Sequence, residues 1–196
     1  MTLERSRVSP RPGRTSIAVA HRSVDEIWFS LPNLHHIAVD RGEGLGSFHT
    51  AVDYLRRGEA VGIFPEATIS RAMELKEFKT GAVRIAAEAG VPLVPVIMWG
   101  TQRMMTKDHP RDFSRGKTIA ITVGEPMRPT GDDPVGDTAR LKAQMSRMLA
   151  ETVAAYPADE QPPGSWWVPA SMGGSAPTLE VAARLDVEEK RDRARK

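Results

Sequence analysis

The sequence SFHTAVDYLRRGEAVGIFPEATISR (residues 47–71) decides the fold, because it passes from an amphipathic stretch to a short apolar one and then to a polar block. Apolar residues recur at spacings of four and three, which predicts a helix over Ser47–Arg57 with Ser47 as its N-cap. The short apolar run Ala60–Pro65 predicts a buried strand. This alternation is typical of an α/β domain.

The same alternation continues on both sides of this stretch. Further strands are predicted at Ser16–His21, His36–Asp40, Leu93–Trp99 and Thr118–Val123. Further helices are predicted at Phe78–Ala89, where Gly90 supplies a C-cap, and at Asp137–Tyr156. We interpret the methionines of the longer helix as core filling. The fold class is α/β, with a mixed, mostly parallel sheet flanked by helices.

The two ends of the chain differ from this body. Residues 1–14 are basic and unpatterned, and we expect a disordered arm. Residues 15–156 form the predicted α/β domain, and residues 157–196 a Pro/Gly-rich connector followed by a charged, solvated C-terminal helix over Thr178–Lys196. The Trp166-Trp167 pair of the connector suits either a membrane interface or a fold back onto the domain, and we favour the second.

Composition excludes several kinds of chemistry. The chain has 196 residues and no cysteine, so it has no thiol nucleophile and no Cys-based zinc site. Its net charge of +2 gives no argument for nucleic acid. No run reaches the roughly 20 apolar residues that a bilayer span requires. We therefore expect a peripheral or cytosolic protein.

A histidine with nearby carboxylates follows the first predicted strand. His21 precedes Asp25 and Glu26 at short range. A carboxylate fixes the tautomer of a histidine and stabilises its imidazolium, so this group can act as a general base. Taken alone, a histidine that merely caps the following helix is the commoner explanation.

Glycines and an arginine follow the next predicted strand. Gly42, Gly44 and Gly46 lack the full G-x-G-x-x-G spacing of a dinucleotide loop, and we interpret them as a flexible turn. Arg41 is of more interest, because a guanidinium at a strand end can hold a phosphate through two parallel hydrogen bonds.

The polar block after Ala60–Phe64 is the third candidate. Glu66 lies there with hydroxyls and Arg71, a cluster that a packed core does not need. Strand ends of open α/β sheets commonly carry ligand sites. The alternative is that Pro65-Glu66 simply opens a loop.

Taken together and in order, these segments resemble the glycerolipid acyltransferases, specifically the bacterial PlsC-type 1-acyl-sn-glycerol-3-phosphate acyltransferases. That family shows an N-H-x-S-x-x-D block, a strand ending in D-R, an F-P-E-G-T-R-S block, an F-K-x-G-A turn and a V-P-x-V-P-V strand. The matching segments are Ala20–Glu26, Ile37–Arg41, Phe64–Ser70, Phe78–Ala82 and Val91–Val96. The resemblance covers about residues 16–127 and implies a glycerol-3-phosphate acyltransferase-like fold.

The resemblance implies transfer of an acyl group from acyl-CoA or acyl carrier protein to lysophosphatidic acid, giving phosphatidic acid. His21 would deprotonate the acceptor hydroxyl while Asp25 or Glu26 holds the imidazole, and Arg41 would bind the phosphate. The further substrate-binding residues expected are Glu66, Ala67, Thr68, Ser70, Arg71 and Lys79. It implies no metal, cofactor or nucleic acid, and a peripheral position at the cytoplasmic face of the cell membrane.

The sequence also departs from the family pattern. Ala20 replaces the asparagine, and Glu26 stands where the aspartate is expected, with Asp25 one place early. Ala67 replaces glycine and Ile69 replaces the arginine, so Arg71 or Lys79 would supply the lost cation. We expect a shortened member, since His21 and Arg41 are closer together than the family pattern has them. A catalytically impaired lipid-binding remnant, or less favourably a nucleotide-binding α/β protein using Gly42–Gly46, remains an alternative.

Overall fold

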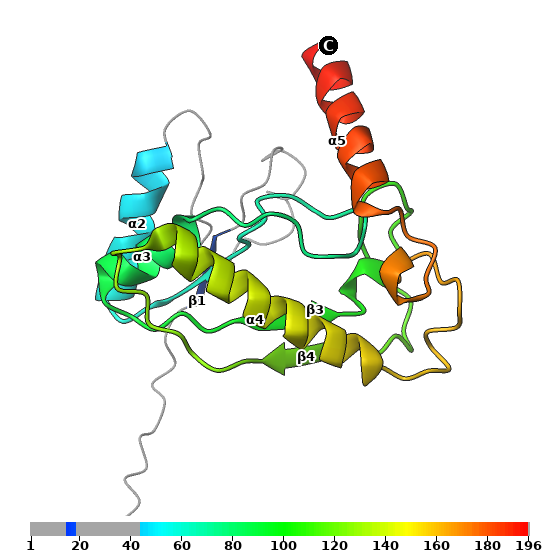
Figure 1. The fold of residues 1–196 in the computed structure, drawn as a ribbon, viewed down its shortest axis with the longest axis horizontal. Coiled ribbons are helices and arrows are strands. Elements are labelled where there is room, and N and C mark those ends of the chain that lie inside the picture. The colour runs from blue at the N-terminus through cyan, green and yellow to red at the C-terminus, as the bar shows by residue number, and fades with distance from the viewer. Residues whose placement is uncertain (1–14, 19–43, 196) are drawn as a thin grey trace, which may run out of the picture.

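A computed structural model describes residues 15–18 and 44–195 of this chain. Its strands are β1 (Thr15–Ala18), β2 (Ala60–Ile63), β3 (Val96–Trp99) and β4 (Ala120–Val123). Its α-helices are α2 (Gly44–Arg56), α3 (Gly81–Ala89), α4 (Pro134–Ala154) and α5 (Leu179–Ala194), and Figure 1 shows α4 lying along β3 and β4. Two short 3₁₀ turns, η1 (Thr101–Arg103) and η2 (Ala170–Met172), lie between them. The predicted alternation of helices and strands is confirmed.

The described strands form two pairs of opposite kind. β1 and β2 are parallel, with Ile17 opposite Gly62, whereas β3 and β4 are antiparallel, with Ile97 opposite Thr122. The predicted mixture is therefore present. A mostly parallel sheet is not what the described strands show, since one pair is of each kind. The predicted strand His36–Asp40 lies outside the described residues.

Prolines delay the start of β3. The prediction placed its beginning at Leu93, but the strand begins at Val96. Pro92 and Pro95 have no N–H to donate to a ladder, so regular pairing starts after them. Leu93 still forms an isolated bridge with Met127, in which each backbone N–H donates to the other residue's carbonyl at 2.8 and 2.9 Å.

The helix boundaries also differ from the prediction. α2 begins at Gly44, so Gly44 and Gly46 lie in a helical turn, and the interpretation of these two glycines as a flexible turn is wrong. α3 begins at Gly81, three residues later than predicted, because Phe78 is buried in the core and the backbone of Lys79 closes a loop. The predicted C-cap is confirmed, since Gly90 has φ 67°.

The core lies between α4, the β3–β4 pair and the connector. Its buried residues are Met73, Phe78, Val83, Ile97, Trp99, Leu141, Met145, Met148, Leu149, Val153, Tyr156, Trp167, Val168 and Ala176. Met145 and Met148 are buried among them, as predicted. The other face of α4 is exposed, so this helix buries one stripe only.

The connector folds back onto the domain, as we favoured. Trp167 is 5% exposed, and its ring centroid lies 5.7 Å from that of Trp99 and 5.5 Å from that of Tyr156. Trp166 remains partly exposed and stacks on His109 at 3.7 Å. Aromatic pairs in this range add to the stabilisation that burial already gives.

Gly100, at the end of β3, provides a test of this packing. It has φ 98°, and an added Cβ would overlap the carbonyl oxygen of Thr118, which also accepts a hydrogen bond from the Tyr156 hydroxyl at 2.5 Å. We predict that Gly100→Ala lowers the free energy of unfolding by about 3 kcal/mol or more, from left-handed strain plus displacement of this contact. Urea unfolding measures it.

The control for this variant is Gly58→Ala, because Gly58 also has a positive φ but faces open space. Gly58→Ala should lower the free energy of unfolding only by the left-handed strain, about 1–2 kcal/mol. Equal losses in the two variants would show that the contact at Gly100 contributes nothing.

Candidate active site

The polar block predicted from sequence opens a closed loop after β2. We call residues 64–79 the block loop. The Lys79 N–H donates to the Pro65 carbonyl at 2.8 Å and joins the two ends of the loop. Further in, the Lys76 N–H donates to Glu66 Oε2 at 2.9 Å. The backbone therefore fixes the position of the Glu66 carboxylate.

Glu66 is half-buried, and its carboxylate is costly to ionise. Burial raises the pKa of Glu66 above its usual value, although the Lys76 backbone N–H and the charges of Lys76 and Lys142 act in the opposite direction. Desolvation is thus the stronger influence on this carboxyl. The strand before it was predicted to be buried, but β2 is half-buried to exposed. A carboxyl with a raised pKa at a strand end is a candidate functional group.

The turn after Glu66 places strain on Ala67. This residue has φ 54°, and its N–H donates to the Phe64 carbonyl at 3.2 Å. The left-handed region favours glycine, which is the residue that the resembling family has at this position. Of the block's hydroxyls, Thr68 is exposed, whereas Ser70 Oγ is buried and has no hydrogen-bond partner among the described residues.

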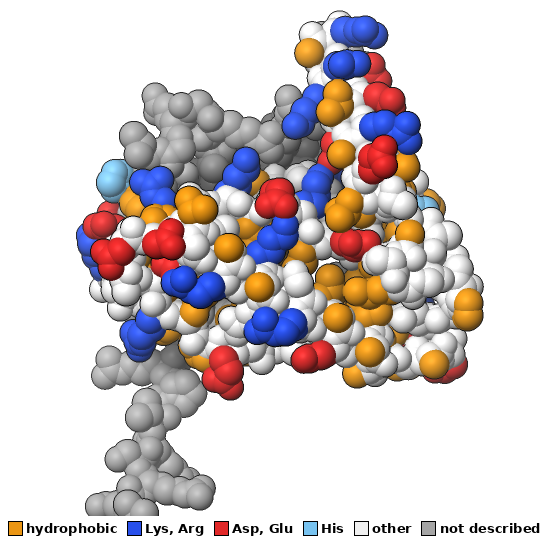
Figure 2. Space-filling model, in the orientation of Figure 1, with side chains coloured by type: hydrophobic (Ala, Val, Ile, Leu, Met, Phe, Trp, Pro, Cys, Tyr) orange, Lys and Arg blue, Asp and Glu red, His pale blue; other side chains and the backbone are white. Residues whose placement is uncertain are grey.

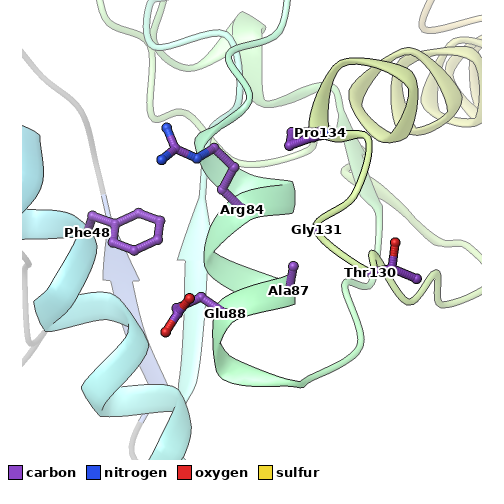
Figure 3. A pocket seen from close by; sticks show the side chains of 7 residues that line it. All are labelled: Phe48, Arg84, Ala87, Glu88, Thr130, Gly131 and Pro134. Atoms are coloured by element: carbon purple, nitrogen blue, oxygen red, sulfur yellow. The ribbon is translucent and has the colours of Figure 1, made fainter.

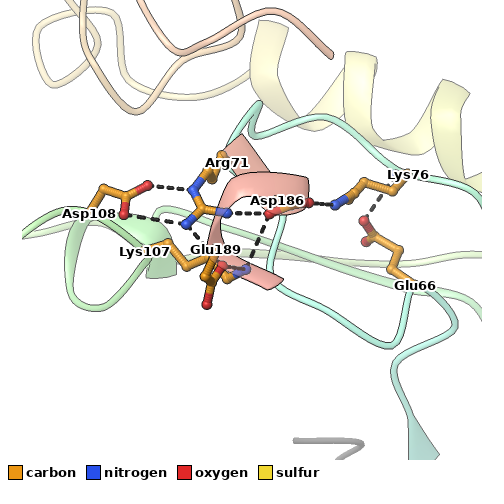
Figure 4. A network of polar contacts seen from close by, with 7 residues as sticks. All are labelled: Glu66, Arg71, Lys76, Lys107, Asp108, Asp186 and Glu189. Carbon is orange, nitrogen blue, oxygen red and sulfur yellow. Dashed lines mark hydrogen bonds and ion pairs between the residues drawn. The ribbon is translucent and has the colours of Figure 1, made fainter. Parts of the chain in front are cut away.

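Arg71 is buried and paired with acids from two other segments (Figure 4). Its Nε donates to Asp108 Oδ2 at 2.5 Å, and its Nη2 donates to Glu189 Oε2 at 3.0 Å. Its Nη1 contacts Asp186. The hydrogen bond to Asp108, aided by Glu189 and opposed by burial, raises the pKa of the guanidinium above its usual value. Arg71 therefore stays charged while only 7% exposed.

Two lysines share the same acids of α5. Lys107 Nζ lies 3.3 Å from Asp186 Oδ1 and 3.0 Å from Glu189 Oε2, and Lys76 Nζ also pairs with Asp186. Burial by itself would raise the pKa of Asp186, but Lys76 and Lys107 together lower it. We call the set Arg71, Lys76, Lys107, Asp108, Asp186 and Glu189 the α5 ion cluster.

The structure brings some of the predicted site residues together. Glu66, Ala67, Thr68, Ser70 and Arg71 share the block loop, and Lys79 is exposed where the loop closes. His21, Asp25, Glu26 and Arg41 lie outside the described residues, so their roles stay predictions.

Sequence reasoning missed the partners of Arg71. It gave no role to Lys76, Lys107, Asp108, Asp186 or Glu189, and it described α5 as a solvated helix. The helix is confirmed, but solvation is wrong for one of its faces, since Asp186 and Glu189 contact the block loop. The available signal was the spacing of three between these two acids, which puts them on one helical face.

A separate cleft of about 280 Å³ lies between α2, α3 and the segment before α4 (Figure 3). Its lining residues are Phe48, Arg84, Ala87, Glu88, Thr130, Gly131 and Pro134. Arg84 Cζ lies 5.6 Å from the Phe48 ring centroid, in cation–π range. None of the lining residues belongs to the block loop. Within the described residues, no group of three His, Asp or Glu side chains is arranged to hold a metal ion.

Comparison with known proteins points to one family. Residues 6–99 match a family model described as Acyltransferase, a range that contains His21, Arg41 and the whole block loop. This part of the chain is similar to the acyltransferase family. The strand-end blocks that suggested this family all begin within the matched residues.

Relatives within the family share a single printed activity. The chain is 37% identical over 98 residues to a 1-acyl-sn-glycerol-3-phosphate acyltransferase of Bacillus subtilis, covering 50% of this chain and 45% of that protein. A probable enzyme of the same name from Mycoplasma pneumoniae is 27% identical over 140 residues, covering 68% and 49%. A chloroplastic one from Brassica napus is 33% identical over 98 residues, covering 50% and 28%. The chain thus matches less than half the length of each.

A solved structure supports the fold. The 1-acyl-sn-glycerophosphate acyltransferase PlsC of Thermotoga maritima aligns with a TM-score of 0.52 at 19% sequence identity, covering 76% of this chain and 70% of that one. The mixed α/β fold of this chain is therefore similar to the fold of that protein. None of the helices in residues 44–195 is both long and apolar enough to cross a membrane.

The strained turn of the block loop yields one prediction. Ala67→Gly should raise the free energy of unfolding by up to about 1 kcal/mol. Glycine avoids the left-handed penalty of about 1–2 kcal/mol, but it loses more backbone entropy on folding, which offsets part of the gain. Thermal and urea unfolding measure it. The control, Ala143→Gly on the exposed face of α4, should lower stability by about 0.5–1 kcal/mol. Destabilisation of both would show that Ala67 is unstrained.

The raised pKa of Glu66 yields a pH-dependent prediction. Between its unfolded pKa of about 4.3 and its higher folded pKa, the folded chain binds more protons, so Glu66 lowers stability as pH rises through that window. Glu66→Gln keeps an acceptor for the Lys76 N–H. The variant should therefore be more stable than the parent chain at neutral pH and equal to it below the unfolded pKa.

Urea unfolding across this pH range makes the measurement. Glu77→Gln is the control, because the Glu77 side chain is 91% exposed. A Glu66→Gln variant that is less stable than the parent chain at neutral pH would contradict a carboxylate whose desolvation is only partly compensated.

Proposed function

We propose that this chain transfers an acyl group from acyl-CoA or acyl carrier protein to 1-acylglycerol-3-phosphate, forming phosphatidic acid in phospholipid biosynthesis. The observation that carries the proposal is the family match over residues 6–99, which includes the His21, Arg41 and Glu66 blocks in order. The printed names of the relatives agree with this activity.

His21 is the proposed general base. It takes the proton of the acceptor hydroxyl as the oxygen attacks the thioester carbonyl. The resulting tetrahedral intermediate collapses, the C–S bond breaks, and the departing thiolate takes the proton from the imidazolium. Asp25 or Glu26 holds the imidazole and stabilises its charged form. The step balances without a metal or cofactor.

Cations at the strand ends are the proposed phosphate ligands. Arg41 offers a guanidinium fork, and Glu66, Ala67 and Thr68 line the acceptor side of the site. Ile69 stands where the family block has an arginine, so that cation is missing from this chain. While α5 is docked, Lys79 is the available replacement, because it is exposed at the closing end of the block loop, whereas the Arg71 guanidinium is then paired with three carboxylates.

We place this reaction at the cytoplasmic face of the cell membrane, with the chain as a peripheral protein. The acceptor and the product are both lipids, so the chain must meet them at a lipid–water boundary.

Purified protein should convert lysophosphatidic acid and acyl-CoA to phosphatidic acid. His21→Ala should lower kcat by about 10²–10⁴, the contribution of a positioned general base. The control is His49→Ala, because His49 is exposed on α2 and has no role in the proposed reaction. Release of free CoA thiol, followed with a thiol reagent, measures the rate.

Two results would contradict the proposal. Full activity of the His21→Ala variant would show that His21 is not the general base. Vesicle sedimentation with anionic lipid but no turnover from either donor would instead favour the catalytically impaired lipid-binding remnant.

A further inference from the structure

Two carboxylates of α5 occupy a site made of three cations. Asp186 and Glu189 lie on one face of the helix and meet Arg71, Lys76 and Lys107 (Figure 4). The side chains of Arg71, Lys76 and Lys107 are 7%, 22% and 22% exposed, so water screens these charges only partly. Asp108 supplies the remaining negative charge from the other side of Arg71.

Apolar contact along α5 is limited, with Val181 and Leu185 half-buried. Ala182 is the residue of the helix that is buried, at 2% exposure, while Leu179 and Val187 are each 46% exposed. The helix projects from the body toward the C-terminus (Figure 1), and Figure 2 shows charges of both signs along it. Ion pairs therefore contribute to its docking beside a small apolar contact.

The chemistry of the site suits a phosphate monoester. Asp186 and Glu189 together bring two negative charges, and a phosphate monoester carries about 1.5–2 negative charges at neutral pH. The Arg71 guanidinium presents a fork that matches phosphate oxygens, and a lysine ammonium binds phosphate as a point charge.

Two buried hydroxyls stand beside these cations in the sequence. Ser70 Oγ precedes Arg71, and Thr106 Oγ1 precedes Lys107. Neither has a hydrogen-bond partner within residues 15–18 and 44–195. Buried polar atoms are normally paired, so these two hydroxyls are exceptions within the described residues.

We propose that Arg71, Lys76 and Lys107 form a phosphate-monoester site whose internal competitor is α5, through Asp186 and Glu189. Half-buried cations left without an anion would be strongly destabilising, so α5 leaves only as a phosphate enters. The inference rests on the proposed function for the source of the phosphate, which is the lysophosphatidic acid headgroup or a free phosphate. Release of α5 then exposes the block loop that holds Glu66.

The first test removes the competitor. Asp186→Asn combined with Glu189→Gln should bind inorganic phosphate at least about tenfold more tightly than the parent chain, because the site no longer has to expel α5. Calorimetry at constant ionic strength measures the affinity. The matched control is Glu188→Gln with Asp192→Asn, which removes the same charge from exposed positions of α5 and should leave the affinity unchanged.

Equal or weaker phosphate binding by the Asp186/Glu189 variant would overturn the proposal. If that variant loses its fold, hydrogen exchange on the unaltered chain decides. Phosphate should speed the exchange of α5 amides, whereas chloride at the same ionic strength should not. Unchanged α5 exchange, or an equal effect of chloride, would overturn the proposal.

Three ligands then separate the sources. Lysophosphatidic acid below its micelle concentration, glycerol 3-phosphate and inorganic phosphate are compared for release of α5. A larger effect of lysophosphatidic acid assigns the site to the lipid headgroup, and equal effects assign it to free phosphate. Neither readout needs turnover, so failure of acyl transfer with α5 release intact would count against the proposed function alone.

Discussion

Arg71 imposes the constraint on which the candidate site depends, because a guanidinium that is only 7% exposed needs anions around it. No carboxylate within the block loop contacts its guanidinium. Asp108 comes from the segment after η1, and Asp186 and Glu189 come from α5. One buried charge thus joins three segments that are far apart in the sequence, and it fixes the loop that presents Glu66.

Local pattern predicted most of the described fold. The helices around Ser47–Arg57 and Asp137–Tyr156 and the strand after residue 59 follow from apolar spacing alone. Boundaries failed where a backbone or packing effect intervened: Pro92 and Pro95 withheld donors, and Phe78 went into the core instead of the first turn of α3. The sequence alone did not decide where Trp167 lies, because an aromatic residue suits either a core or a membrane interface.

The candidate site was predictable only in part. The position of Glu66 to Arg71 directly after a strand could be predicted from the sequence, because the strand and the loop are local. The burial of that strand could not, since β2 is half-buried to exposed. The partners of Arg71 could not, since the spacing of Asp186 and Glu189 puts both acids on one face of α5 but does not show whether that face is solvated or docked. The left-handed turn at Ala67 was hidden as well, because alanine carries no signal for a positive φ.

The α5 ion cluster has a consequence for how related sequences diverge. Three cations face three acids, so a change at Asp186 or Glu189 leaves a surplus charge in a poorly hydrated place. We expect substitutions there to be tolerated in pairs that conserve charge, so positions 71, 76, 107, 108, 186 and 189 should covary across relatives that keep this helix. A family member without α5 would be expected to carry fewer cations in its block loop.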